Sequence, residues 1–220
     1  MGKLIVFEGI DGSGKSTQFR LLCKSLDAEG HEYVQLVFPQ YSQPSSALIR
    51  MYLGGEFGSN PDDVNPYAAS SFYAVDRYAS YKKVWQSAYA SGTTIVTDRY
   101  TTANAVHQAA KLEPKQMPAF FKWLYEYEFS LLGLPAPDLV IYFDVPVSIA
   151  ENQIKKRQLE TGAPGDIHEK DSFYLERCRN AAETAAGFFG WSRVLCAPDG
   201  VMKSAEKIHR EVKTLVENIL

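Results

Sequence analysis

Hydrophobic residues are distributed along the chain in two alternating patterns. Short runs rich in β-branched and aromatic residues occupy positions 4–7, 33–38, 93–97, 139–143 and 193–196. Runs of this length are typical of buried strands. The longer stretches between them are rich in Ala, Leu, Lys, Glu and Gln, with apolar residues at helical spacing. Alternating buried strands and helices predict an α/β fold, in which helices cover both faces of a parallel sheet.

Turn-forming residues mark the boundaries between these stretches. Gly30 follows the first helical stretch, Gly92 precedes the third strand, and LPAPD at 134–138 introduces the fourth. We find no internal repeat and no low-complexity segment. We therefore interpret residues 1–220 as a single domain, which at this size can bury roughly 70% of its unfolded surface without a metal or disulfide.

One segment departs from the alternation. KKRQLETGAPGDIHEKD at 155–171 mixes charges with two glycines and a proline before a new helical stretch begins. Two interpretations remain open for it. It is either an exposed connection of ordinary composition or a mobile lid over an active site.

Composition and charge narrow the range of partners. The chain is 45% hydrophobic and 22% charged, with a net charge of −3, which argues against broad electrostatic binding of nucleic acid or anionic lipid. A bound polyanion must then sit in a local pocket. Three cysteines, Cys23, Cys178 and Cys196, show no paired metal spacing, which favours a reduced, cytoplasmic setting. We expect no export signal and no membrane span, because no leader and no long apolar run is present.

The stretch between the first predicted strand and the first predicted helix is rich in glycine. Residues 9–16 read GIDGSGKS, a complete G-x-x-x-x-G-K-[ST] pattern in the context that a phosphate loop (P-loop) requires. Glycines let the backbone turn so that successive N–H groups point inward, and the helix N-terminus adds positive potential. Lys15 can then reach the β and γ phosphates while the Ser16 hydroxyl ligates Mg²⁺. The alternative interpretation is a flexible turn without a ligand.

A phosphate loop does not name the reaction, since GTPases, ATPases and small-molecule kinases share it. The sequence contains no N-K-x-D stretch of the kind that reads guanine. Large mechanical ATPases usually carry more chain than this. These observations favour a compact kinase, with an acceptor site beyond the carboxyl ends of the strands.

Three stretches are expected at those strand ends. LVFPQY at 36–41 ends the second strand, SSFYAVDRYASY at 70–81 is helical, and IVTDRYTTANAVHQ at 95–108 ends the third strand. Helical spacing places Tyr73 and Arg77 on one face. An aromatic side chain that stacks on a base and two arginines that hold a phosphate are what a nucleoside monophosphate site needs.

The same side chains also have purely structural interpretations. Tyr73 is typical of a core residue, and Arg77 and Arg99 are typical of surface ion pairs. All three are expected at the same end of the sheet, which favours a shared site.

The ordered set of motifs resembles the thymidylate kinase family, in its bacterial form. The likeness extends over almost the whole chain, from FEGIDGSGKSTQ through FPQY, FYAVDRY and TDRYTTANAVHQ to YFDVPVSIA. It implies the fold of the P-loop nucleoside monophosphate kinases, with a five-stranded parallel sheet, a lid and usually a homodimer. It also implies transfer of the γ-phosphoryl group of ATP to dTMP with Mg²⁺, which gives dTDP and ADP for dTTP biosynthesis.

The resemblance assigns roles by matching position. It implies that ATP is bound by Gly9, Ile10, Asp11, Gly12, Ser13, Gly14, Lys15, Ser16 and Thr17. It implies that dTMP is bound by Asp11, Phe38, Pro39, Tyr41, Tyr73, Arg77, Arg99, Asn104, His107 and Gln108. Within that set Tyr73 stacks on the base, Asn104 meets the thymine edge and Tyr41 reaches the phosphate. Metal contacts are implied for Ser16, Asp98 and Asp11.

Two positions depart from the wider family pattern. Many eukaryotic members have an arginine after the phosphate-loop aspartate, whereas this chain has Gly12, as in the type that supplies positive charge from its lid. The lid segment here offers Lys155, Lys156, Arg157 and Lys170. His107 stands where many relatives have a bulky aromatic near the sugar 2′ position. It is either a sugar contact or a helix-surface histidine.

The expected reaction is in-line attack of a dTMP phosphate oxygen on the γ-phosphorus of ATP. Because that oxygen is already anionic, positioning and charge neutralisation should supply most of the acceleration. We assign catalytic roles to Lys15, Arg99 and Arg157. A kinase for another nucleotide or a deoxynucleoside and an ATP-binding regulatory module are the alternatives. The Asp98–Arg99 pair together with Tyr73 and Arg77 favours an acceptor site over the regulatory module.

Overall fold

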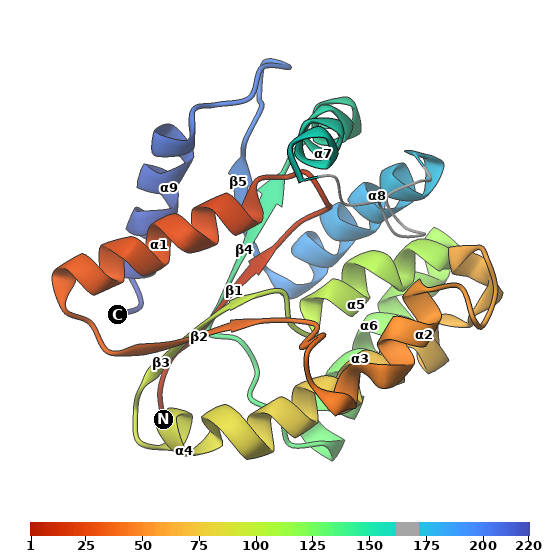
Figure 1. The fold of residues 1–220 in the computed structure, drawn as a ribbon, viewed down its shortest axis with the longest axis horizontal. Coiled ribbons are helices and arrows are strands. Elements are labelled where there is room, and N and C mark those ends of the chain that lie inside the picture. Colours follow the sequence, from red (N-terminus) through yellow and green to blue (C-terminus); the bar gives the residue numbers. More distant parts are fainter. Residues whose placement is uncertain (162–171) are drawn as a thin grey trace.

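The computed structural model describes residues 1–161 and 172–220, with the backbone alone at 160, 161 and 172 (Figure 1). The strands are β1 (Leu4–Glu8), β2 (Tyr33–Val37), β3 (Thr94–Asp98), β4 (Leu139–Asp144) and β5 (Ser192–Leu195). The α-helices are α1 (Lys15–Glu29), α2 (Ala47–Leu53), α3 (Pro66–Ser80), α4 (Gln86–Ala90), α5 (Thr102–His107), α6 (Met117–Tyr125), α7 (Val147–Thr161), α8 (Ser172–Phe189) and α9 (Ala205–Glu217). Two π-helical turns, η3 (Tyr81–Trp85) and η6 (Glu126–Leu131), continue α3 and α6.

The strands form one parallel sheet in the order β2-β3-β1-β4-β5, which confirms the predicted fold class. Successive side chains of β1 point to opposite faces. On one face Phe7 packs edge-on against Phe19 of α1, with ring centroids 5.9 Å apart. On the other, Leu4 and Val6 join a buried cluster with Trp85. Figure 1 shows α1 and α9 on one side of the sheet and α5, α6 and α8 on the other.

The order of the strands determines where a ligand can bind. The chain runs from β1 past β3 to the edge strand β2, whereas after β3 it crosses to β4 on the other side of β1. Ligands of open α/β sheets bind at such a change of direction, beyond the carboxyl ends of the strands. Here the loop after β1 and the residues after β3 lie next to each other, because Phe7 pairs with Asp98.

The predicted lid is only partly within the described residues. Positions 155–161 form the C-terminal end of α7, and 162–171, including Lys170, lie outside the described residues. Among the helices that the structure describes, none is both long and apolar enough to cross a membrane.

Candidate nucleotide-binding site

The glycine-rich loop, residues 9–14, joins β1 to α1. Gly12 and Gly14 have left-handed backbones, with φ of 78° and 84°, and Gly14 caps the N-terminus of α1. A Cβ at Gly12 would lie 2.2 Å from the carbonyl oxygen of Ala150, so the loop packs directly on the first turn of α7. Lys15 begins α1, and its Nζ lies 3.4 Å from Asp11 Oδ1. A glycine-rich turn, a helix N-terminus and a lysine are the components from which phosphate-binding sites are built.

A hydroxyl and a carboxylate meet beside this loop. Ser16 Oγ donates a hydrogen bond of 2.6 Å to Asp98 Oδ2, while the buried Oδ1 has no hydrogen-bond partner among the described residues. Oxygen ligands of this kind suit Mg²⁺. The described residues contain no group of three or more acidic, His or Cys side chains that could hold a metal. A magnesium ion here would therefore need phosphate oxygens of a nucleotide as further ligands.

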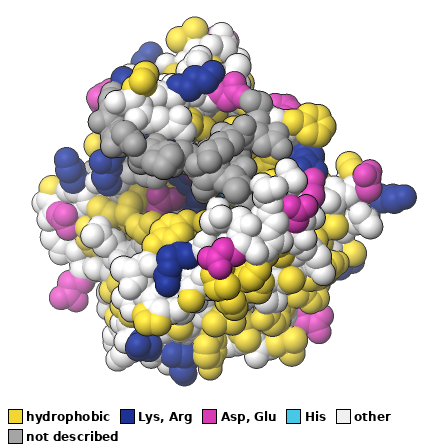
Figure 2. Space-filling model, turned by 45° about the vertical axis from the view of Figure 1, so that its right-hand side comes forward, with side chains coloured by type: hydrophobic (Ala, Val, Ile, Leu, Met, Phe, Trp, Pro, Cys, Tyr) yellow, Lys and Arg dark blue, Asp and Glu magenta, His cyan; other side chains and the backbone are white. Residues whose placement is uncertain are grey.

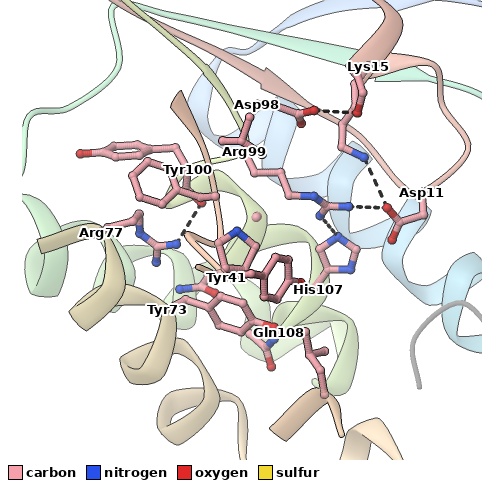
Figure 3. A pocket seen from close by; sticks show the side chains of 17 residues that line it. Asp11, Lys15, Tyr41, Tyr73, Arg77, Asp98, Arg99, Tyr100, His107 and Gln108 are labelled. Atoms are coloured by element: carbon pink, nitrogen blue, oxygen red, sulfur yellow. Dashed lines mark hydrogen bonds and ion pairs between the residues drawn. The ribbon is translucent and has the colours of Figure 1, made fainter. Parts of the chain in front are cut away.

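Arg99 follows β3 and is directed toward the loop. Its backbone is left-handed, with φ of 68°, which is uncommon outside glycine. Its Nη2 donates 2.6 Å to Asp11 Oδ1, and its Nη1 contacts His107 Nε2 (Figure 3). Burial disfavours the charge of this guanidinium. The nearby carboxylates of Asp11, Glu8 and Asp98 outweigh burial and raise its pKa, so the group remains a cation.

A cavity of about 240 Å³ extends from Arg99 toward α3. Its lining includes every predicted dTMP contact, namely Asp11, Phe38, Pro39, Tyr41, Tyr73, Arg77, Arg99, Asn104, His107 and Gln108. Figure 3 shows Tyr73 and Arg77 at one end of this acceptor cavity and Lys15 and Asp11 at the other. The structure therefore brings aromatic and polar side chains and residues of the glycine-rich loop into one cavity.

Arg77 forms a buried ion pair. Its Nε and Nη2 donate to the two carboxylate oxygens of Glu128 at 2.7 and 2.5 Å, and its Nη1 donates 3.3 Å to the carbonyl of Tyr100. Only 1% of Arg77 is exposed, so the interpretation as a surface ion pair is wrong. Tyr73 is half-buried; it packs against a small cluster with Tyr52 and also lines the cavity, so its two interpretations are compatible.

A second cavity of about 450 Å³ lies on the other side of the phosphate loop. Besides loop residues and the start of α1, it is lined by Gln153, Ile154 and Arg157 of α7 and by Met202, Lys203, Ala205 and Ile208. Lys155, Lys156 and Arg157 are all exposed, but of the three only Arg157 lines this donor cavity. Gln18 Nε2 donates 2.9 Å to the carbonyl of Ala205, which holds α1 against the start of α9.

Comparison with known proteins identifies the family. The family model described as thymidylate kinase matches residues 7–208. The chain belongs to the thymidylate kinase family. It is 32% identical to a thymidylate kinase of Mycobacterium tuberculosis over 191 residues, which cover 86% of this chain and 87% of the relative. It is 29% identical to a probable thymidylate kinase of Thermococcus gammatolerans, over 99% of this chain and 97% of the relative. It is 26% identical to a thymidylate kinase of Homo sapiens, over 100% of this chain and 92% of the relative.

His107 is buried, although the sequence left open whether it lies in the sugar pocket or on the helix surface. Only 6% of it is exposed, so the interpretation as a helix-surface histidine is wrong. Because arginine can only donate, Nε2 accepts from Arg99, and Nδ1 carries the proton toward Cys178 Sγ at 3.5 Å. The hydroxyl of Tyr174 donates 2.6 Å to the carbonyl of His107. This residue therefore connects Arg99 to α8.

Three buried acids support the site although the sequence analysis gave them no role, and two of them, Glu8 and Asp76, stand inside the family motifs. Glu8 accepts hydrogen bonds from the Gly9 N–H at 2.8 Å and from a threonine of α5, and burial raises its pKa. Asp76 accepts from the Gln40 N–H and from Ser45, at 2.8 and 2.6 Å, and so anchors the loop after β2. The third acid is Glu128. A signal for Glu128 was available, because it continues the buried helical spacing of Met117, Phe120, Phe121 and Leu124.

Proposed function

We propose that this member of the family transfers the γ-phosphoryl group of ATP to dTMP, giving dTDP and ADP for dTTP biosynthesis. One observation carries the proposal. Asp11, Lys15 and Ser16 line both the donor cavity and the acceptor cavity, so two nucleotides bound in them would meet at these residues. That arrangement supports a kinase over a regulatory module, which needs only a donor site.

The residues at the junction suit in-line transfer. A phosphate oxygen of dTMP forms a bond to the γ-phosphorus while the bond to the bridging oxygen of ADP breaks. The attacking oxygen is anionic, so the chain has to orient the groups and neutralise charge. Lys15 and Arg99 are cations at the junction, and Arg157 is one at the donor cavity. Ser16 and Asp98 would hold Mg²⁺ together with the phosphates, where it would neutralise charge on the transferred group.

The acceptor cavity suits a pyrimidine nucleoside monophosphate. Tyr73 and Phe38 offer ring surface, Asn104 and Gln108 offer polar atoms, and Arg99 offers a cation for the phosphate. Gln108 Oε1 is buried without a hydrogen-bond partner among the described residues, as expected of a group that meets a ligand.

We propose further that the chain is one domain in which residues 155–171 serve as a lid, and that closure excludes water from the junction. We also propose a cytoplasmic enzyme, since the structure leaves Cys23, Cys178 and Cys196 as free thiols. A homodimer through α3 is supported by Val75 and Tyr78, which are 51% and 40% exposed. Figure 2, with the α2 and α3 side turned forward, shows hydrophobic side chains gathered on this face.

An ADP-release assay across a panel of acceptors tests the function. With ATP and Mg²⁺, dTMP is expected to give the highest kcat/KM, above dUMP, dCMP and the purine nucleotides. A higher value with thymidine would assign the chain to deoxynucleoside kinases and overturn the proposal. ATP binding without release of ADP for any acceptor would favour the regulatory module.

A further inference from the structure

Glu128 is completely buried at the aromatic end of the acceptor cavity, on the π-helical turn η6. Its two oxygens accept four hydrogen bonds. Two come from Arg77, at 2.7 and 2.5 Å, one comes from Thr101 Oγ1 at 2.7 Å, and one comes from Asn104 Nδ2 at 3.3 Å. A carboxylate offers about four lone-pair positions, so this one is fully used and cannot itself bind a ligand.

The bond from Asn104 fixes the direction of its amide. Asn104 Nδ2 donates to Glu128 Oε1 and to the carbonyl of Ser70, both at 3.3 Å. Both of these partners can only accept, so both N–H groups of the amide are directed away from the cavity. Asn104 lines the cavity, and the atom left for a ligand is therefore its carbonyl oxygen, an acceptor.

The guanidinium of Arg77 is also held in place, and it presents a donor where Asn104 presents an acceptor. Nε and Nη2 are occupied by Glu128, and one N–H of Nη1 donates to the Tyr100 carbonyl. Nη1 carries a second N–H, which gives the cavity a donor beside the acceptor of Asn104. We propose that Glu128 is a specificity-determining positioning residue, which holds this donor and acceptor so that the cavity takes thymine or uracil and rejects cytosine.

The chemistry of the bases gives the direction of this selection. The N3–H of thymine is a donor flanked by two carbonyl acceptors, which matches an acceptor beside a donor. Cytosine has an unprotonated N3 and a 4-amino donor. Cytosine would therefore set an acceptor against Asn104 Oδ1 and a donor against Arg77. A site built for one pattern rejects the other strongly, because buried polar groups are left unpaired.

The inference rests on the proposed function only in taking the acceptor to be a pyrimidine nucleotide. It is tested with Glu128→Gln, which keeps the shape but offers an amide N–H. That N–H can donate to Asn104 Oδ1 and allows the Asn104 amide to turn around. Dissociation constants for dTMP and dCMP are measured by calorimetry, and kcat/KM by ADP release. The dTMP-to-dCMP preference is expected to narrow at least tenfold in both measurements, through weaker dTMP binding rather than lower kcat.

Asp144→Asn is the matched control. Asp144 is another buried carboxylate that binds two arginines, Arg179 and Arg193, but it lines neither cavity. Asp144→Asn is expected to lower the melting temperature and to leave the base preference unchanged. An unchanged base preference in folded Glu128→Gln, or an equal narrowing in Asp144→Asn, would overturn the inference.

Thr101→Val covers the case in which Glu128→Gln does not fold. Thr101 does not line the acceptor cavity, and its hydroxyl donates to Glu128, so loss of the hydroxyl alone is expected to reach the base through the carboxylate. A narrowing of about three- to tenfold is expected, and an unchanged preference in this variant would then overturn the inference. The calorimetry measures binding and needs no turnover. If the proposed function is wrong, the unmodified chain will release no ADP, and that result is distinct from an unchanged base preference.

Discussion

Individual side chains of the site are held by several elements at once. Arg99 is the clearest example, because its N–H donates to the Phe7 carbonyl at 3.0 Å and its own carbonyl accepts from Thr97 Oγ1 at 2.8 Å. These bonds stabilise a left-handed conformation that costs a non-glycine residue roughly 1 kcal/mol or more. The cost is offset by a guanidinium that reaches Asp11 and His107 together.

Among the residues of the phosphate-loop pattern, Lys15 is the one whose substitution we expect to lower the catalytic rate most. It is buried at the start of α1, so Lys15→Met is the suitable change, because Met keeps much of the side-chain volume. Loss of a charge aimed at the transferred group is expected to lower kcat by at least about 100-fold. Initial-rate kinetics and a circular dichroism melt measure activity and folding. Near-normal kcat in the folded variant would contradict the role of the loop.

His107 has two expected roles, as a contact to the sugar and as the acceptor that supports Arg99, and two substitutions separate them. Both ring nitrogens are engaged, so His107 is expected to act on a ribose 2′-hydroxyl by its volume. His107→Ala should narrow the preference for dTMP over its ribose counterpart, within the roughly 100-fold range of a pocket that only crowds a hydroxyl. His107→Phe should keep the preference but lower kcat, because Arg99 loses its acceptor. Measuring kcat/KM for both acceptors decides, and an unchanged ratio in His107→Ala would place the sugar elsewhere.

The hydrophobic pattern alone predicted the strands of the sheet. Each of the five predicted runs became a strand whose ends differ from it by no more than one residue, since buried strands depend on a local apolar run. Several residues that line or support the cavities were missed because they are brought there by contacts between distant elements. Met202 and Lys203 reach the donor cavity because α9 packs on α1, and Glu128 depends on where η6 meets α3 and α5. No local pattern specifies such packing.

The helix α7 carries the cation that we expect to replace a side chain missing from the phosphate loop. Arg157→Ala should lower kcat more than it raises the KM for ATP, as expected of a contact that strengthens in the transition state. Lys155→Ala is the control, because Lys155 is exposed on the same helix and does not line the donor cavity. Steady-state kinetics with varied ATP gives both constants. A change in KM alone would make Arg157 a ground-state contact, and no change would transfer the role to Lys156 or Lys170.

In the molecule as a whole, a half-buried lysine joins two regions that are distant in the sequence. Lys111 Nζ donates to the Tyr52 hydroxyl and to the Val64 carbonyl, both at 2.9 Å. Burial lowers the pKa of Lys111 from 10.5 to about 8, while the nearby Asp62 opposes this and Arg177 adds to it. The folded chain therefore releases this proton at a lower pH than the unfolded chain does.

Lys111→Met makes this effect measurable. Between about pH 8 and 10.5 the unfolded state binds more protons at Lys111, so the unfolding free energy of the unmodified chain should rise relative to the variant. The difference in unfolding free energy between the two proteins should change by at most about 1.4 kcal/mol per pH unit. Well below pH 8 this difference should no longer depend on pH. Urea titrations of both proteins at several pH values give the difference. A pH-independent difference would contradict the lowered pKa.

The proposed dimer is also tested at this scale. Replacing Val75 and Tyr78 together by Glu places charges on the exposed face of α3, where they would be buried in a dimer at high cost. Sedimentation analysis is expected to give a dimer for the unmodified chain and a monomer for the double variant, with little change in melting temperature if the monomer folds. A monomeric unmodified chain would contradict the proposal.

The contact between Gly12 and Ala150 also bears on how sequences in this family can change. An arginine at position 12 would bring its Cβ to 2.2 Å from the Ala150 carbonyl oxygen, so either the loop or the first turn of α7 would have to move. Gly12→Arg in this chain is therefore not a one-step exchange of one cation position for another. The side chain at position 12 and the placement of the first turn of α7 therefore constrain each other, and a change at one is expected to require an accommodating change at the other.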